Sequence, residues 1–393
     1  MTDCCIIGGG IVGLSIAREL AGRGLSVRVV AREGGRNTAS WAAAGILPPA
    51  PDHAAATPNE RLTAWSDRLH RRWARELLDE TGIDNGLRAC GGLYVGHGLT
   101  GHELLRGQAE AWRTKGVTCE WLAGAEVAGY EPAVAGAVAR GAVTCGYALP
   151  DEAQIRPPRH LEALEKSCAL RGVEIAAGVE IRGLDVRGAR IEGVIAPGAG
   201  GRVRAEWYVL AAGAWSGGLA ERLGVAIDTR PIRGQIAQLR LRPQRLCRVV
   251  NRGLDYLVPR VDGTLLVGST LEDAGFDAST DDATIGRLVA LARDLLGDLP
   301  SAQVERAWAG LRPGSADGLP TIGPVPAVAN AVLATGHFRA GLHQSTGTAA
   351  LVADLITGRT PPLDPIFFAA DRAPATASPD AVAAQPARVR EPC

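Results

Sequence analysis

Three glycines near the start of the chain have the spacing of a phosphate-binding turn. Gly8, Gly10 and Gly13 follow the apolar run Cys4–Ile7, which has the length of a strand buried on both faces of a parallel sheet. The next stretch, Ile11–Leu20, has helical spacing. In such a unit the glycines allow a tight turn, close approach of a pyrophosphate, and close packing of helix on strand. The partial positive charge of the helix N-terminus favours phosphate, so the pattern predicts dinucleotide binding.

The second strand of this unit lacks the acidic residue that usually binds the ribose hydroxyls. Strand Ser26–Val30 is followed by Ala31 at the expected position, and Arg32 and Glu33 come next. Glu33 could reach the ribose instead, or it could be a solvated loop charge, and both interpretations stay open. The local motif alone therefore does not choose between FAD and NAD.

Two later segments indicate a flavin. Ala39–Leu47 is rich in small residues, and Val209–Ser216 is an apolar strand that also ends in small residues. Small side chains let a backbone pass close to a flat ring, as flavin binding requires. Taken alone, the first segment is also consistent with the start of an alanine-rich helix.

Together with Gly336–His343, these segments resemble the D-amino-acid-oxidase-like family of FAD oxidoreductases, and within it most closely the glycine oxidases of thiamin biosynthesis. The resemblance spans about residues 4–368. Its motifs occur in the family's order: ASWAAAGIL, LPDEAQIRPPRHLEAL, VLAAGAWS, RPIRGQIAQL, DYLVPR, WAGLRPGSADGLPTIGP and GHFRAG. The resemblance implies an α/β (α+β) fold, with a discontinuous Rossmann-like FAD-binding domain and a substrate domain built around an antiparallel sheet.

The same resemblance implies FAD-dependent oxidative deamination of glycine or another small amino acid. A hydride would pass from the substrate Cα to flavin N5, giving an imine, and oxygen would be reduced to hydrogen peroxide. The imine could serve thiamin thiazole synthesis. Three alternatives stay open: a D-amino-acid dehydrogenase with another electron acceptor, an oxidase of N-methyl amino acids, and a flavin-binding protein without turnover.

Four residues match family positions at or near the substrate. Arg312 matches the arginine that binds the substrate carboxylate, a role suited to its planar two-pronged group, although most arginines form surface ion pairs. Tyr256 matches a tyrosine that meets the same carboxylate, or it is a core aromatic of a strand. Arg339 matches a residue close to substrate and flavin, and Leu271 matches an apolar residue of the substrate pocket. No general base is required if the substrate enters as the neutral amine.

A larger set is expected to bind FAD. Ile11 and Val12 offer amides to the pyrophosphate, Arg32 lies beside the ribose, and the backbone of Val179 pairs with adenine. We expect a helix from Leu342 onward, with its N-terminus facing the flavin N1 and O2 positions. The full expected set is Gly8, Gly10, Ile11, Val12, Gly13, Arg32, Glu33, Ala39, Ser40, Ala44, Gly45, Ile46, Val179, His337, Phe338, Arg339, Ala340, Gly341, Leu342 and His343. No cysteine occupies the family's position for covalent attachment, so we expect non-covalent FAD.

Composition excludes several other classes of protein. The 393 residues include 42 Lys plus Arg and 42 Asp plus Glu, so net charge does not favour nucleic acid or an anionic membrane. No apolar run reaches the roughly 18–20 residues of a membrane span. The eight cysteines form no CxxC pair, which indicates a reducing cytoplasm, and the seven histidines show no metal-ligand spacing. We expect no metal, and we expect a homo-oligomer.

Periodicity places the elements that would position these residues. Helices are predicted at 62–81, 103–115, 159–170 and 284–296, and strands at 92–95, 173–175, 204–210, 235–241, 256–261, 264–268 and 331–334. The resemblance implies that residues 1–48, 145–230 and 305–365 form the FAD-binding domain and that 49–144 and 231–304 form the substrate domain. Residues 370–393, rich in Ala and Pro, are predicted to be a disordered tail.

Overall fold

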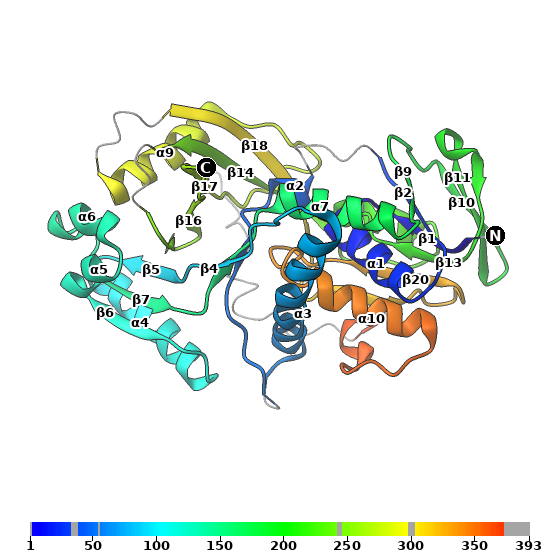
Figure 1. Cartoon of the computed structure of the whole chain (residues 1–393), viewed down its shortest axis with the longest axis horizontal. Coiled ribbons are helices and arrows are strands. Elements are labelled where there is room, and N and C mark those ends of the chain that lie inside the picture. Colours follow the sequence, from blue (N-terminus) through cyan, green and yellow to red (C-terminus); the bar gives the residue numbers. More distant parts are fainter. Residues whose placement is uncertain (1, 33–37, 54–55, 242–245, 298–302, 373–393) are drawn as a thin grey trace, which may run out of the picture.

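The computed structural model describes residues 2–32, 38–53, 56–241, 246–297 and 303–372. Two sheets, one mainly parallel and one mainly antiparallel, occupy the two halves of an elongated molecule (Figure 1). The α/β (α+β) class predicted from the sequence is confirmed. Glu33 and residues 373–393 of the predicted tail lie outside the described residues.

The first sheet has six strands, all parallel to their neighbours except the pair β19–β20. Their order is β19 (Thr321–Pro324), β20 (Ala331–Thr335), β13 (Ala205–Leu210), β1 (Thr2–Ile7), β2 (Val27–Val30) and β9 (Glu174–Ala176). Cys4 and Cys5 on β1 are both fully buried, and each belongs to a different core cluster. Successive side chains of a strand face opposite sides, so this is the double burial that Cys4–Ile7 predicts.

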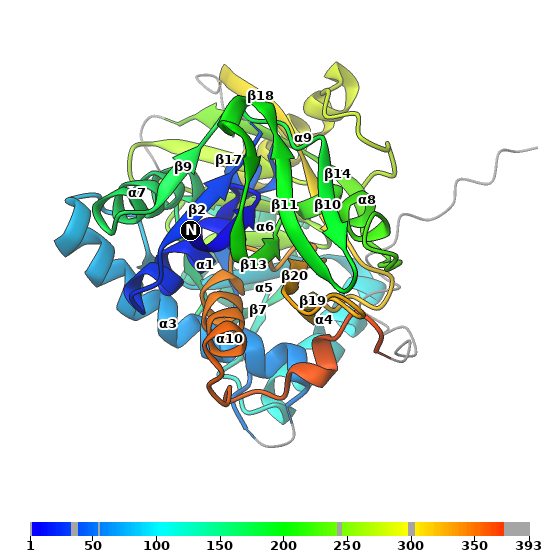
Figure 2. The same ribbon diagram turned by 90° about the vertical axis from the view of Figure 1, so that its right-hand side faces the viewer.

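Different layers cover the two faces of this sheet. On one side lie α1 (Ile11–Gly22), α10 (Ser345–Thr357) and α7 (Pro157–Leu170), and the long helix α3 (Pro58–Thr81) packs on α7 and α10. The other side carries α8 (Ser216–Glu221) and a three-stranded antiparallel sheet of β10 (Gly183–Arg187), β11 (Arg190–Ala196) and β12 (Gly201–Val203), as Figure 2 shows for β10 and β11.

The second sheet has eight strands and is antiparallel except where β15 meets β5. Their order is β18 (Gln303–Gly314), β14 (Arg230–Arg240), β17 (Thr264–Gly268), β16 (Asp255–Pro259), β15 (Val249–Arg252), β5 (Gly92–Gly96), β7 (Cys145–Leu149) and β6 (Glu120–Ala123). Apolar residues of α5 (Gly124–Tyr130), α6 (Ala135–Ala139) and α9 (Asp282–Leu296) share its core, and α4 (Gly98–Thr114) packs on β7. One face of the sheet is left to line a cavity.

Short elements lie where the two halves meet. They are α2 (Ala39–Ala42) and the small sheet of β3 (Ile46–Leu47), β8 (Ala153–Gln154) and β4 (Arg88–Ala89), of which Figure 1 labels α2 and β4. Thr38 caps α2 by accepting a hydrogen bond from the Trp41 amide. The helical interpretation of this segment is therefore confirmed for its first four residues.

The four predicted long helices are present as α3, α4, α7 and α9, and each begins two to five residues earlier than predicted. The first turn of a helix is set by capping rather than by apolar spacing. In α3, for example, Thr57 and Glu60 form a reciprocal capping box and Pro58 takes the first helical position. Apolar periodicity therefore predicts the ends of these helices better than their starts.

The helix expected from Leu342 onward begins at Ser345, so that prediction is wrong by three residues. Side chains of α3 take the backbone groups that a longer helix would use. His70 Nε2 lies 3.0 Å from the carbonyl oxygen of Leu342 and 2.9 Å from that of His343, and Ser66 Oγ accepts from the Gly347 amide. The residues before Ser345 form turns instead.

The domain boundaries stay a prediction. By hydrogen bonding, β7 and β18 are strands of the second sheet, although residues 145–149 and most of 303–314 were assigned by resemblance to the FAD-binding domain. Among the helices of the described residues, none has the length and apolar character needed to cross a membrane.

Candidate functional site

A large cavity of about 1080 Å³ lies between the two sheets. Its lining includes the residues just beyond the carboxyl ends of β1, β2, β13 and β20, and one face of the second sheet. Ligands of open parallel sheets bind at such carboxyl ends. The volume lies just above the usual range for small-molecule and cofactor pockets.

The phosphate end of the cavity is a glycine cradle. Gly8 has a φ of +121°, and an added Cβ there would lie 2.3 Å from the Ala211 carbonyl oxygen. A Cβ on Gly13 would lie 1.9 Å from the Gly8 carbonyl oxygen. Gly8 and Gly10 line the cavity, whereas Gly13 does not and serves the packing of α1 on β1, as expected for the third glycine.

The N-terminus of α1 faces this cradle without an acidic residue in its first turn. Gly10 is the N-cap and has no side chain, and the Ile11 amide donates to Ser40 Oγ at 2.9 Å. Ile11, Val12 and Ser40 all line the cavity. The backbone amides and the positive end of the α1 dipole therefore lie at the place where a pyrophosphate would be expected.

The nucleoside end is built around the residues that follow β2. Ala31 is buried against the cavity wall, and Arg32 is exposed with its guanidinium 4.3 Å from the centre of the Trp215 ring. Val179 lines the cavity, and its amide already donates to the Ala31 carbonyl at 2.9 Å. The pairing with adenine that the resemblance implies would therefore use the Val179 carbonyl oxygen, and it stays a prediction.

The small-residue segment after the second strand forms the middle wall. Ala39, Ser40, Ala44, Gly45 and Ile46 all line the cavity. Gly45 has a φ of +74°, and an added Cβ would lie 2.1 Å from the Ile155 carbonyl oxygen, so glycine is required there.

Arg260, which sequence reasoning missed, holds this wall in place. It is buried, and its guanidinium donates to the carbonyl oxygens of Ala44 at 2.6 Å and Ile155 at 3.1 Å. Burial lowers the pKa of Arg260 to about 10, which leaves it protonated at neutral pH. The sequence feature that could have indicated this role is the arginine at the end of the largely apolar segment DYLVPR.

The loop from His337 to His343 lines the cavity at every position. Phe338 has a φ of +47°, a strained conformation for an aromatic residue, and its amide donates to the Pro313 carbonyl at 2.9 Å. His337 Nε2 lies 2.9 Å from Thr348 Oγ1, and burial lowers the pKa of His337 to about 3, so the ring is neutral. The loop is therefore held by hydrogen bonds to Pro313 and to Thr348.

Arg312 extends from β18 into the cavity. Its guanidinium donates to Ser269 Oγ at 2.9 Å and to the Thr270 carbonyl at 3.0 Å, and it lies over Gly234 on the neighbouring strand. A Cβ on Gly234 would lie 2.1 Å from Nη1 of Arg312, so this glycine makes room for the cation. Within the described ranges no carboxylate forms an ion pair with Arg312, unlike the surface arginine considered above.

The charge of Arg312 is maintained inside the protein. Burial lowers the pKa of Arg312 to about 10, and the Tyr256 hydroxyl opposes that shift. Tyr256 is buried in a cluster with Ile236 and Trp308, and it also lines the cavity. Tyr256 is therefore a core aromatic that also lines the cavity, and its contact with a substrate carboxylate stays a prediction.

Arg339 supplies a second positive charge to the cavity. It is an exposed lining residue, and its charge further lowers the pKa of Arg312. Leu271 is not among the residues that line the cavity, so the expectation for it is not met. Some lining residues were not among the expected site residues, including Trp41, Tyr94, Asn251 and Ser269.

Comparisons with known proteins show which family the chain belongs to. The sequence model of the family described as FAD dependent oxidoreductase matches residues 3–355. The chain belongs to this family. It is 35% identical to a glycine oxidase of Pseudomonas aeruginosa, over 93% of this chain and 97% of the relative. It is 34% identical to the bifunctional protein ThiO/ThiG of Nostoc sp., over 90% of this chain and 52% of that longer relative.

A solved structure shows the same architecture. The glycine oxidase of Geobacillus kaustophilus superposes with a TM-score of 0.87 at 29% identity, covering 95% of this chain and 99% of that one. The resemblance seen in the sequence is confirmed, and the chain is an FAD-dependent oxidoreductase similar to glycine oxidases.

Proposed function

We propose that this enzyme oxidises the amine of glycine or another small α-amino acid and passes the electrons to oxygen, forming hydrogen peroxide. The observation that carries the proposal is the Arg312 guanidinium, which faces the same cavity as the glycine cradle and has no carboxylate partner among the described residues. An arginine kept charged and unpaired in a cavity is suited to bind a substrate carboxylate.

The residues present fit FAD. A Cβ at Gly8 or Gly13 would collide with backbone, so the cradle is built for a ligand and a closely packed helix rather than for side chains. FAD, when bound, supplies the acceptor for the hydride that leaves the substrate Cα. The chain's contribution is binding: α1 and Ser40 at the pyrophosphate, Val179 at the adenine, and the 337–343 loop at the isoalloxazine.

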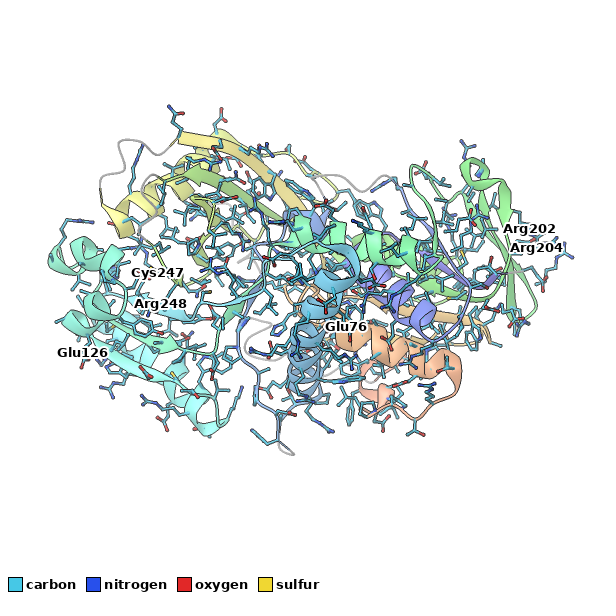
Figure 3. The ribbon with its side chains drawn as sticks, in the orientation of Figure 1. Glu76, Glu126, Arg202, Arg204, Cys247 and Arg248 are labelled. Atoms are coloured by element: carbon cyan, nitrogen blue, oxygen red, sulfur yellow. The ribbon has the colours of Figure 1, made fainter. Side chains whose placement is uncertain are left out.

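We propose that FAD is held without a covalent bond. No cysteine is found among the described residues that line the cavity. The exposed Cys247 lies beside Arg248, in the half of the molecule that contains the second sheet (Figure 3).

Arg312 and Tyr256 would orient the substrate. The two prongs of the guanidinium match the two carboxylate oxygens, and the Tyr256 hydroxyl can donate to one of them. Ser269 and Thr270 hold the guanidinium by its outer nitrogens, so its position is set before the substrate arrives. Arg339 adds attraction for an anion at the same end of the cavity.

A small amino acid is supported by the names of the relatives, which include glycine oxidases. The resemblance to glycine oxidases of thiamin biosynthesis, together with the ThiO/ThiG proteins, supports a role in supplying an imine for thiazole synthesis. The seven described cysteines are unpaired, which supports a reducing cytoplasm. A homo-oligomer stays a prediction.

The test is a peroxide assay on the purified, FAD-loaded protein with glycine, sarcosine and D-alanine. We expect peroxide with at least one of these substrates, and oxygen uptake without any added acceptor. Turnover that requires an artificial acceptor would point to a dehydrogenase. The absence of turnover with any amino acid under both conditions would contradict the proposal.

A further inference from the structure

A buried carboxyl group lies next to the face of the second sheet that lines the cavity. Glu152, between β7 and β8, has no exposed surface. Gly92 on β5 makes room for it, because a Cβ there would lie 2.4 Å from the carboxyl group. Carboxyl groups are rarely buried without a charged partner, and no ion pair involves Glu152 in the described part of the chain.

Tyr94 connects this carboxyl group to the cavity. The Tyr94 hydroxyl donates to Glu152 Oε2 at 2.7 Å, and Tyr94 lines the cavity. Its ring stacks on Tyr147, with centroids 4.6 Å apart, which fixes the position of the hydroxyl. The hydroxyl hydrogen of Tyr94 is used in the hydrogen bond to Glu152. The lone pairs of the hydroxyl oxygen therefore remain to accept a hydrogen bond from the cavity side.

The strand register places Tyr94 in a row with Tyr256. Tyr94 pairs with Asn251 across β5 and β15, and Asn251 pairs with Tyr256 across β15 and β16. Directly paired residues share one face of a sheet, and all three line the cavity. Two strand spacings of about 4.8 Å put the Cα atom of Tyr94 roughly 10 Å from the Cα atom of Tyr256 along this row. An amino acid held by its carboxylate at Tyr256 and Arg312 therefore has room to direct its amino group toward Tyr94.

Two polar atoms around this row lack partners. Glu152 Oε1 and Asn251 Nδ2 are buried, and neither has a hydrogen bond to any described residue. Asn251 still lies close enough to lower the pKa of Glu152, although no well-formed bond joins them. Capacity for hydrogen bonding is thus left at the sheet face beside the cavity.

We propose that Glu152, acting through the Tyr94 hydroxyl, accepts the proton that the substrate ammonium group loses before its Cα is oxidised. This proposal rests on the proposed function. An N–H bond of the ammonium breaks and its proton goes to Tyr94 Oη, while the Tyr94 proton goes to Glu152 Oε2. The substrate becomes the neutral amine, Glu152 becomes neutral, and no electrons are transferred in this step.

The charges around the pair suit the transfer. Burial raises the pKa of Glu152 to about 7 although Tyr94 and Asn251 lower it, so the carboxylate can take up a proton near neutral pH. Burial raises the pKa of Tyr94 well above its ordinary value, so its hydroxyl stays neutral and relays rather than stores the proton. The titratable and charged groups near Glu152 and Tyr94 are Cys90, Tyr130, Tyr147 and Arg339. The positive charge of Arg339 disfavours a second cation beside it, such as the substrate ammonium group.

The test is the pH profile of kcat/KM for Glu152→Gln, which keeps the shape of the side chain but cannot accept the proton. In the unchanged enzyme kcat/KM should rise through about pH 7, because Glu152 must be ionised to act. The variant should lose about 100-fold at neutral pH, the scale of general-base catalysis. It should regain wild-type turnover above the pKa of the substrate ammonium, where the amine enters already neutral.

Two further variants sharpen the result. Tyr94→Phe keeps the stacked ring and should show the same loss and the same recovery at high pH, and it carries the test if Glu152→Gln does not fold. Asp151→Asn is the matched control, since it removes one charge from the exposed neighbouring position and should leave the profile unchanged.

A readout apart from turnover is the binding of acetate, a carboxylate without an amine, followed by the change in flavin absorbance. Acetate affinity should be the same in all variants. An unshifted pH profile in both Glu152→Gln and Tyr94→Phe, or an equal loss at every pH, would overturn the proposal. Failure of the proposed function would differ, because the unchanged enzyme would then oxidise no amino acid.

Discussion

At the scale of single residues, Arg312 shows what a sequence can and cannot reveal. Its role was expected from a matched motif, and the structure places it in the cavity. Its setting was not foreseeable, because Gly234, Ser269 and Thr270 are 42 to 78 positions away and meet it only through strand register. The same applies to Glu152 and Tyr94, which are 58 positions apart.

Replacing Arg312 by alanine should leave FAD bound and its visible spectrum nearly unchanged, but remove the group that anchors the substrate. Loss of one partner of a buried charge pair costs roughly 2–5 kcal/mol, which is about 30-fold to several thousand-fold in kcat/KM. Arg312→Lys should recover only part, because an ammonium cannot reproduce the two-pronged contact.

The matched control for Arg312→Ala is Arg306→Ala, an exposed arginine of the same strand. Steady-state kinetics with the best substrate measures both variants. Turnover by Arg312→Ala close to that of the unchanged enzyme would mean that the carboxylate is held elsewhere, and Arg339 would then be the next candidate.

At the scale of elements, the sequence predicted the strand-turn-helix unit at the N-terminus almost completely. Its glycines, its doubly buried strand and its helix are where spacing placed them, because local sterics decide such a unit. The start of α10 was misplaced, because Ser66 and His70 from a distant helix decide it. Tertiary contacts of this kind leave no local pattern.

Gly13→Ala tests the packing of α1 on β1. The new Cβ would lie 1.9 Å from the Gly8 carbonyl oxygen, so helix and strand must separate, and overpacking of this kind costs about 1–3 kcal/mol. We expect a lower melting temperature and weaker FAD binding, measured by thermal unfolding and by titration of FAD fluorescence.

Gly107→Ala is the control for this change. Gly107 lies on the exposed side of α4, where an added Cβ meets nothing within 4 Å. Alanine in a helix interior is favoured over glycine by about 1 kcal/mol, so the melting temperature should stay the same or rise. Equal behaviour of the two variants would show that the close contact between α1 and β1 is not needed.

At the scale of the whole molecule, the cavity receives side chains from both sheets, and this joins the two halves of the site. The glycine cradle and Val179 belong to the first-sheet half, whereas Tyr256, Ser269 and Arg312 belong to the second. A ligand that fills the cavity contacts both halves. Binding of FAD should therefore stabilise the entire fold rather than one domain.

The last prediction follows from this arrangement. Because FAD binds the folded chain and not the unfolded one, it should stabilise the protein by about 2.7 kcal/mol at 100 times its dissociation constant, and the melting temperature should rise with FAD concentration in one transition. Because no cysteine lines the described part of the cavity, heat or acid should release intact FAD into the supernatant. Absorbance of the supernatant and calorimetry with increasing FAD measure the two effects. Flavin retained in the washed precipitate would show a covalent link, and two separate transitions of which only one responds to FAD would show that the halves are not coupled through the cofactor.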